Sequence, residues 1–196
     1  MRLDVRRLAS RKVTLEARDW IRIFQTSHAA TPTGAGYGSS RFSSPGGAFR
    51  VLYAAEDFAT AFAEAVVRDR FEDRLRRYLY RQTFEALVAA EIQTLSSISV
   101  IDLTNGGAYE LGVDTDAKGA RAHTKGQAFA EALHQATAVD GVLFSSRLTG
   151  GRCVAVFDRG FGKLTARPAV DLIRVQALYD EIGRLGITVR RNRNLP

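Results

Sequence analysis

The feature that most constrains the fold is a series of short apolar runs, which irregular, glycine-containing stretches separate along the chain. The runs are rich in β-branched and aromatic residues, a composition typical of strands. They occupy residues 20–24, 49–53, 99–103, 141–145 and 153–157. Because regular helices do not alternate with these runs, their order predicts an α+β fold rather than a doubly wound α/β sheet.

Other stretches have helical periodicity or fit two structures. Apolar residues recur at helical spacing after Asp57, which predicts a helix with Asp57 as its N-cap. The same spacing continues among charges of both signs over 68–81 and predicts a solvated helical face there. Residues 86–93 fit either a strand or a helix. Thr124 and Gln127 have the spacing of a capping box, so another helix is expected to begin at this point.

The C-terminal part of the chain predicts one more helix and a basic tail. The helix is expected over about 171–185, with Asp171 as its cap, Tyr179 on its inward face and Gly186 as its stop. The tail over 190–193 carries three arginines and no acidic residue.

Length and composition set further bounds. A chain of 196 residues suffices for one domain with a substantial core, so residues 1–196 are expected to form a single domain. The net charge of +7 fits a nucleic-acid partner, an anionic substrate or an acidic protein partner, and it also fits a plain codon bias toward arginine. The one cysteine, Cys153, excludes a disulfide within the chain. No apolar run could span a bilayer, so a cytoplasmic protein is expected.

Arg41 is the first candidate for a functional side chain. It lies in the glycine-rich segment 29–47, where small neighbours would let its planar guanidinium group approach a phosphate. The segment does not fit a dinucleotide-binding loop, because it leads into a strand and not into a helix. His28, His123 and His134 lack the spacing of metal ligands, so no metal is expected.

The other candidates lie at the ends or edges of expected elements. Glu64 is at the edge of the apolar stripe after Asp57, where its carboxylate could face a cleft. Ser145 and Ser146 end a strand, a position that suits either a ligand or a turn. Cys153 lies within an apolar strand, which indicates a core residue rather than a nucleophile. Taken singly, each residue also fits an ordinary structural role.

Taken in order, these pieces resemble the RES-domain family, which is named for its Arg, Glu and Ser. The family pattern is a glycine-rich loop with an Arg-aromatic pair and a Pro-Gly, then V-L-Y, an alanine-rich helix with Glu, D-L-T, D-G-[IV] and a strand that ends in Ser. The resemblance covers about residues 20–157 and rests on segments 39–42 (SSRF), 45–46 (PG), 51–53 (VLY), 61–64 (AFAE), 102–104 (DLT), 140–142 (DGV) and on Ser146. The chain has Ser43-Ser44 where the family often has Asn-Pro, and either Ser145 or Ser146 could be the family serine.

The resemblance implies both a fold and an activity. The fold would be an ADP-ribosyltransferase-like split sandwich of mixed β-sheets with flanking helices. The protein would be the toxin of a bacterial toxin–antitoxin pair with an Xre-like helix-turn-helix antitoxin. It would deplete NAD+ by cleaving the nicotinamide–ribose bond, as a glycohydrolase or phosphorylase. The implied catalytic residues are Glu64, Arg41 and Ser146, and the implied NAD+-binding residues are Arg22, Arg41, Tyr53 and Ser146.

The chemistry of these side chains suits NAD+, and three other functions stay open. Arg41 and Arg22 would bind the phosphates, Tyr53 would stack on a ring, and Glu64 would stabilise an oxocarbenium-like transition state, with Ser146 orienting the ligand. One alternative is a protein ADP-ribosyltransferase that uses NAD+. Another is a basic module that binds nucleic acid, and a catalytically inactive interaction protein is a third.

Overall fold

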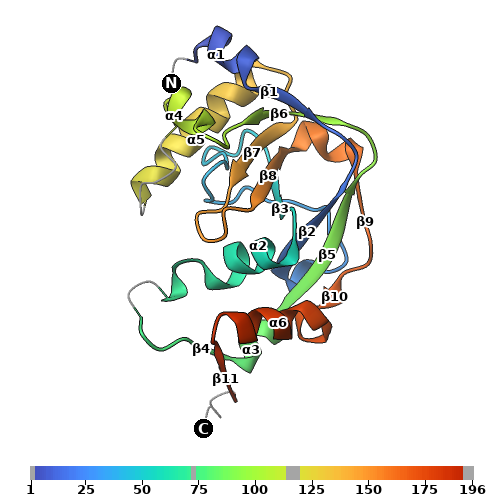
Figure 1. Cartoon of the computed structure of the whole chain (residues 1–196). Helices are drawn as coiled ribbons and strands as arrows, with labels where there is room; N and C mark the ends of the chain where they lie inside the picture. The colour runs from blue at the N-terminus through green and yellow to red at the C-terminus, as the bar shows by residue number, and fades with distance from the viewer. Residues whose placement is uncertain (1–2, 72–73, 114–119, 192–196) are drawn as a thin grey trace.

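Figure 1 shows the computed structural model, which describes residues 3–71, 74–113 and 120–191. Within these ranges, nine strands form one curled, mixed sheet in the order β1-β6-β7-β8-β3-β2-β5-β10, and β9 pairs with β5. The strands are β1 (Lys12–Leu15), β2 (Asp19–Gln25), β3 (Val51–Ala55), β5 (Leu87–Thr94), β6 (Ile98–Asp102), β7 (Gly141–Ser145), β8 (Arg152–Phe157), β9 (Leu164–Ala166) and β10 (Val170–Asp171). Strands β6 and β7 run parallel, and the other neighbours in this sheet run antiparallel.

The sheet opens into two halves between β2 and β3. A single residue pair, Ile21 with Ala55, joins these two strands. On either side the pairing is extensive, with seven pairs between β2 and β5 and five between β3 and β8. The α+β prediction and the split arrangement that the resemblance implied are thus confirmed.

Helices flank both halves of the sheet (Figure 1). The α-helices are α1 (Val5–Ser10), α2 (Phe58–Phe62), α3 (Arg81–Glu85), α4 (Gly107–Glu110), α5 (Ala120–Ala136) and α6 (Gln176–Arg184). Shorter helical turns are η1 (Thr26–His28), the π-helical η2 (Ala63–Val67), η3 (Arg68–Phe71), η4 (Asp158–Lys163) and η5 (Leu172–Arg174). A small parallel ribbon pairs β4 (Tyr78–Tyr80) with β11 (Thr188–Arg190). Helix α2 packs against β2, β3 and α6, which places η2 beside the opening in the sheet.

Buried apolar side chains form two clusters. The larger one contains Phe62 of α2 and Phe129 of α5, and the smaller one contains Trp20 of β2 and Leu52 of β3. Burying a large apolar side chain contributes about 1.5–3 kcal/mol, so the larger cluster holds α2 and α5 firmly against the sheet.

Several predictions from the sequence are confirmed with small shifts. The expected strands at 20–24 and 141–145 are β2 and β7, and the one at 49–53 begins two residues late as β3. The ambiguous segment 86–93 is β5. Asp57 caps α2, because its Oδ1 accepts a hydrogen bond from the Thr60 N–H at 2.7 Å.

Two helix predictions are wrong in part. In the described part of 68–81, helical structure is limited to η3 and to Arg81 at the start of α3, because Arg68 has a positive φ of 26° and residues 78–80 pair with β11 instead. Thr124 is not an N-cap, since α5 already includes Ala120. The Gln127 side chain donates to the glycine-rich segment 29–47 and not to a helix end.

The C-terminal helix is shorter than expected. Asp171 makes no side-chain cap, and the segment divides into η5 and α6. Tyr179 does not face inward, because it is 56% exposed. Gly186 does end the helix, with a φ of 61° that glycine adopts without strain. Of the basic tail, Arg193 lies outside the described residues.

Candidate active site

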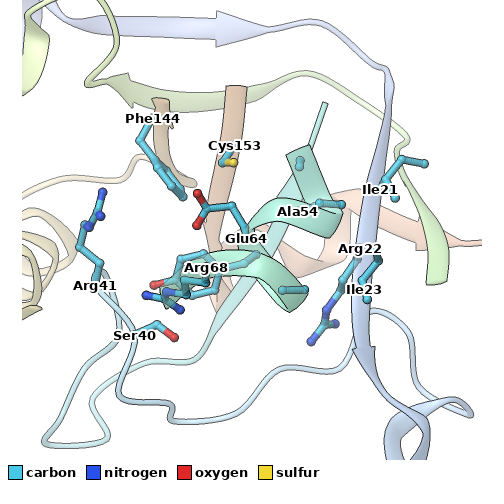
Figure 2. A pocket seen from close by; sticks show the side chains of 14 residues that line it. Ile21, Arg22, Ile23, Ser40, Arg41, Ala54, Glu64, Arg68, Phe144 and Cys153 are labelled. Atoms are coloured by element: carbon cyan, nitrogen blue, oxygen red, sulfur yellow. The ribbon is translucent and has the colours of Figure 1, made fainter. Parts of the chain in front are cut away.

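A pocket lies where the two halves of the sheet separate. Its volume is about 190 Å³. Strands β2 and β3 form one side, α2 and η2 form another, and Ser40 and Arg41 of the glycine-rich segment 29–47 contribute a third (Figure 2). The lining residues that carry polar or aromatic groups are Arg22, Ser40, Arg41, Tyr53, Glu64, Arg68, Phe144 and Cys153. The pocket therefore brings three guanidinium groups to one carboxylate.

Glu64 is presented by a π-helical turn. Helix α2 starts at the Asp57 cap and widens into η2 after one and a half turns, and Glu64 is in the first turn of η2. π-Helical turns are rare in proteins as a whole, but those that occur are often found at functional sites. The Glu64 Oε1 accepts a hydrogen bond of 2.7 Å from the Ser146 hydroxyl.

Ser146 fixes this carboxylate from behind the pocket. Its side chain is only 3% exposed. The Ser146 hydroxyl oxygen also accepts a hydrogen bond from the Leu148 N–H at 3.2 Å, in the turn between β7 and β8. Ser146 does not line the pocket itself, and its hydroxyl instead contacts Glu64 and the turn. Of the two adjacent serines, the structure therefore brings Ser146 to Glu64.

Arg41 is buried and faces the pocket. Only 9% of the Arg41 surface is exposed to solvent. Burial lowers the pKa of its guanidinium group, and the positive charge of Arg147 lowers it further, while the carboxylate of Glu64 raises it. Its Nε is buried and makes no hydrogen bond within the described ranges. An arginine in such surroundings is suited to an anionic partner.

Helix α5 holds the segment that carries Arg41. Gln127 donates from its Nε2 to the carbonyl oxygens of Ser39 and Ser40, at 3.1 and 3.2 Å. One residue earlier, Gly126 lies so close to Arg41 that a Cβ there would be 2.5 Å from the Arg41 carbonyl oxygen. The face of α5 thus determines where Arg41 lies, through contacts between residues far apart in the sequence.

Tyr53 links β3 to the same segment. Its hydroxyl oxygen accepts a hydrogen bond from the Phe42 N–H at 2.8 Å. Burial raises the pKa of this phenol to about 12. Its ring meets Phe144 edge to face with the ring centres 6.4 Å apart, and both residues line the pocket. That Tyr53 stacks on a ligand ring stays a prediction.

Arg22 lies on β2, on the far side of the pocket from Arg41 (Figure 2). Its Nη1 donates to the carbonyl oxygens of Pro32 and Gly34, at 2.5 and 2.6 Å. Burial lowers the pKa of its guanidinium group to about 10. Arg22 therefore anchors the start of the glycine-rich segment as well as lining the pocket.

Sequence reasoning missed part of the pocket. It placed Arg68 on a solvated helical face, whereas the residue lines the pocket. It assigned Cys153 to the core, and the residue is indeed buried, with a thiol pKa that burial raises to about 12, yet it also lines the pocket. The positive φ of Arg68 leaves no mark in the sequence. Cys153 and Glu64 come together only through the tertiary structure, since they lie on β8 and η2.

Among the residues that the structure describes, no three His, Cys, Asp or Glu side chains gather so that they could hold a metal ion. None of the helices in the described ranges is both long and apolar enough to cross a membrane.

Comparison with known proteins adds a family and a fold. The model of the RES domain family matches residues 16–175. No curated protein matches the chain. Among solved structures, a chain of the crystal structure of the M. tuberculosis MbcT–MbcA toxin–antitoxin complex superposes with a TM-score of 0.63 at 22% identity. The match covers 90% of this chain and 94% of that chain, and at this identity it shows the fold.

Proposed function

Because the chain belongs to the RES domain family, we propose that it is the toxin of a toxin–antitoxin pair and that it cleaves the nicotinamide–ribose bond of NAD+. The observation that carries the proposal is the pocket itself. A carboxylate that Ser146 holds in place faces guanidinium groups, and Arg41 among these is buried with a polar atom that has no partner in the described residues. NAD+ offers a diphosphate for the cations and a ribose that becomes positively charged in the transition state.

Glu64 has the central role in the proposed reaction. When the bond between ribose C1′ and the nicotinamide nitrogen breaks, the electron pair leaves with nicotinamide, which departs as a neutral molecule. The ribose then has oxocarbenium character, as in glycoside hydrolysis. The fixed carboxylate of Glu64 stabilises this charge, which exists in the transition state and not in the bound substrate. Arg41 holds the diphosphate and thereby the position of C1′.

The neighbours of Glu64 favour a small acceptor. Protein-modifying ADP-ribosyltransferases commonly use an acidic or amide residue shortly before the catalytic Glu to activate the acceptor side chain. In this chain the residue two positions earlier is Phe62, which is fully buried in the core. We therefore propose water or phosphate as the acceptor. Water adds to C1′ and releases a proton to give ADP-ribose, and phosphate gives the corresponding 1-phosphate.

The proposed partner is an Xre-like helix-turn-helix antitoxin that blocks the pocket. A flexible end segment with a carboxylate would imitate the phosphates of NAD+ beside Arg41, because a guanidinium group binds both anions in the same planar geometry. A complex in which the antitoxin lies far from residues 34–47 would contradict this mode of inhibition. Co-expression of the antitoxin is expected to restore growth to cells in which the toxin alone lowers NAD+.

One experiment separates these functions. The purified chain is incubated with NAD+ labelled in the adenylate part, with a chelator, with and without cell lysate, and the products are resolved. Free labelled ADP-ribose or its 1-phosphate supports the proposal. Label on a single protein band would instead favour protein ADP-ribosylation. An intact NAD+ pool together with strongly salt-dependent DNA binding would favour the basic nucleic-acid-binding module.

A further inference from the structure

Arg68 occupies a backbone position that an arginine rarely adopts. It directly follows the π-helical turn that carries Glu64, with φ at 26° and ψ at −119°. Residues other than glycine avoid positive φ, because Cβ then crowds the neighbouring backbone. Strained positions of this kind persist where the surrounding structure enforces them, and they cluster at ligand-binding sites. An arginine at this point therefore calls for an explanation beyond local conformation.

The side chain of Arg68 turns into the pocket and lies near Arg41. Figure 2 shows both residues in the half of the pocket opposite Arg22. After burial, which is the main cause, the charge of Arg68 contributes to lowering the pKa of Arg41. The Nη2 of Arg68 lies 3.5 Å from the Nε2 of His123 on α5. Two like charges thus share one side of a partly enclosed pocket, where an anion between them would be strongly favoured.

We infer that Arg68 is a second phosphate-binding residue, which forms with Arg41 a pair of guanidinium groups that holds the diphosphate of the ligand. The choice of a diphosphate rests on the proposed function. Arg22 lies on the opposite side of the pocket, where its Nη1 donates to two carbonyl oxygens of the glycine-rich segment. The Arg68 side chain lies beside Glu64 and on the same side of the pocket as Arg41 (Figure 2). Binding the diphosphate at this point places the ribose next to the carboxylate.

The test measures binding of ADP-ribose, which carries the diphosphate but no nicotinamide bond to cleave. Isothermal titration calorimetry compares the wild-type chain with Arg68→Gln, Arg68→Gly and the control Arg70→Gln, which removes one positive charge from an exposed residue two positions away. Arg68→Gln is expected to raise the Kd for ADP-ribose about tenfold, and Arg70→Gln less than twofold. Arg68→Gly is expected to raise the Kd equally while its Tm stays at or above that of wild type, since glycine relieves the strain.

The outcomes separate this inference from the proposed function. A Kd for Arg68→Gln within twofold of wild type, or a wild-type chain that does not bind ADP-ribose, overturns the inference. A Tm of Arg68→Gly well below wild type also counts against it, because the arginine would then be a structural residue. If Arg68→Gln weakens ADP-ribose binding but the wild-type chain leaves NAD+ intact, the inference stands and the proposed function fails.

Discussion

Gly126→Ala should impair ligand binding through Arg41, although alanine favours helices. An ideal Cβ at position 126 lies 2.5 Å from the Arg41 carbonyl oxygen and 2.6 Å from its Cγ. Ordinary contact begins near 3.4 Å, so α5 and the Arg41 segment would have to separate by about 0.9 Å. Backbone on one side and a helix on the other leave no flexible group to absorb this shift. The hydrogen bonds from Gln127 to the same segment would lengthen with it.

The expected magnitude follows from this displacement. Misplacing a substrate-positioning group by about 1 Å can cost about a hundredfold in rate, so kcat/KM for NAD+ should fall about 30- to 100-fold. In stability, overpacking costs about 1–3 kcal/mol, while the better helix propensity of alanine returns about 0.5–1 kcal/mol. The variant should therefore remain folded at 25 °C but unfold at a lower denaturant concentration.

The matched control is Gly183→Ala in α6. Gly183 is also helical, but it is exposed, and a Cβ there would meet nothing within 4 Å. This control should gain about 0.5–1 kcal/mol and keep wild-type kinetics. Denaturant unfolding and NAD+ turnover are measured on both variants. If Gly126→Ala turns over NAD+ like the control, α5 does not set the position of Arg41 and the reasoning is refuted.

Three further predictions concern single side chains of the site. Ser146→Ala removes the hydrogen-bond donor to Glu64 and should lower kcat about tenfold with little change in KM. A rise in KM of similar size would indicate that Ser146 contacts the ligand instead. Tyr53→Phe leaves the buried Phe42 N–H without its acceptor and should cost about 1–3 kcal/mol in urea unfolding, and an unchanged midpoint would contradict this. Because burial raises the pKa of the Cys153 thiol to about 12, its thiolate fraction at pH 8 is roughly a thousandfold below that of a free cysteine. A thiol reagent should therefore react far more slowly with native than with unfolded protein, and similar rates would show an accessible thiolate.

The strands could be predicted where the side chains clearly favour extended backbone. Runs such as 20–24 and 141–145 combine β-branched and aromatic residues, and both form strands at those positions. Segment 86–93 stayed ambiguous because its two adjacent alanines suit a helix as well, and pairing with β2 decided for a strand. The helical periodicity over 68–81 was misleading, because the positive φ of Arg68 interrupts the helix and residues 78–80 pair with β11.

The candidate site was accessible from the sequence only as an ordered set of motifs. The structure brings Arg22, Arg41, Tyr53 and Glu64 to one pocket, with Ser146 behind Glu64. What joins them are contacts across long sequence separations, such as that between Gly126 and Arg41, which no local pattern encodes. Their catalytic and binding roles stay predictions.

The most direct test of the account is the release of nicotinamide from NAD+ by the wild-type chain and by Glu64→Gln. Both proteins are assayed free of any partner, with thermal unfolding recorded to show that each is folded. The account predicts one nicotinamide for each NAD+ consumed by wild type. It predicts a loss of at least a hundredfold in kcat for Glu64→Gln, at a similar Kd for NAD+ and a similar Tm. Equal rates for the two proteins, or no nicotinamide from folded wild-type protein, would contradict the central role of Glu64 in NAD+ cleavage.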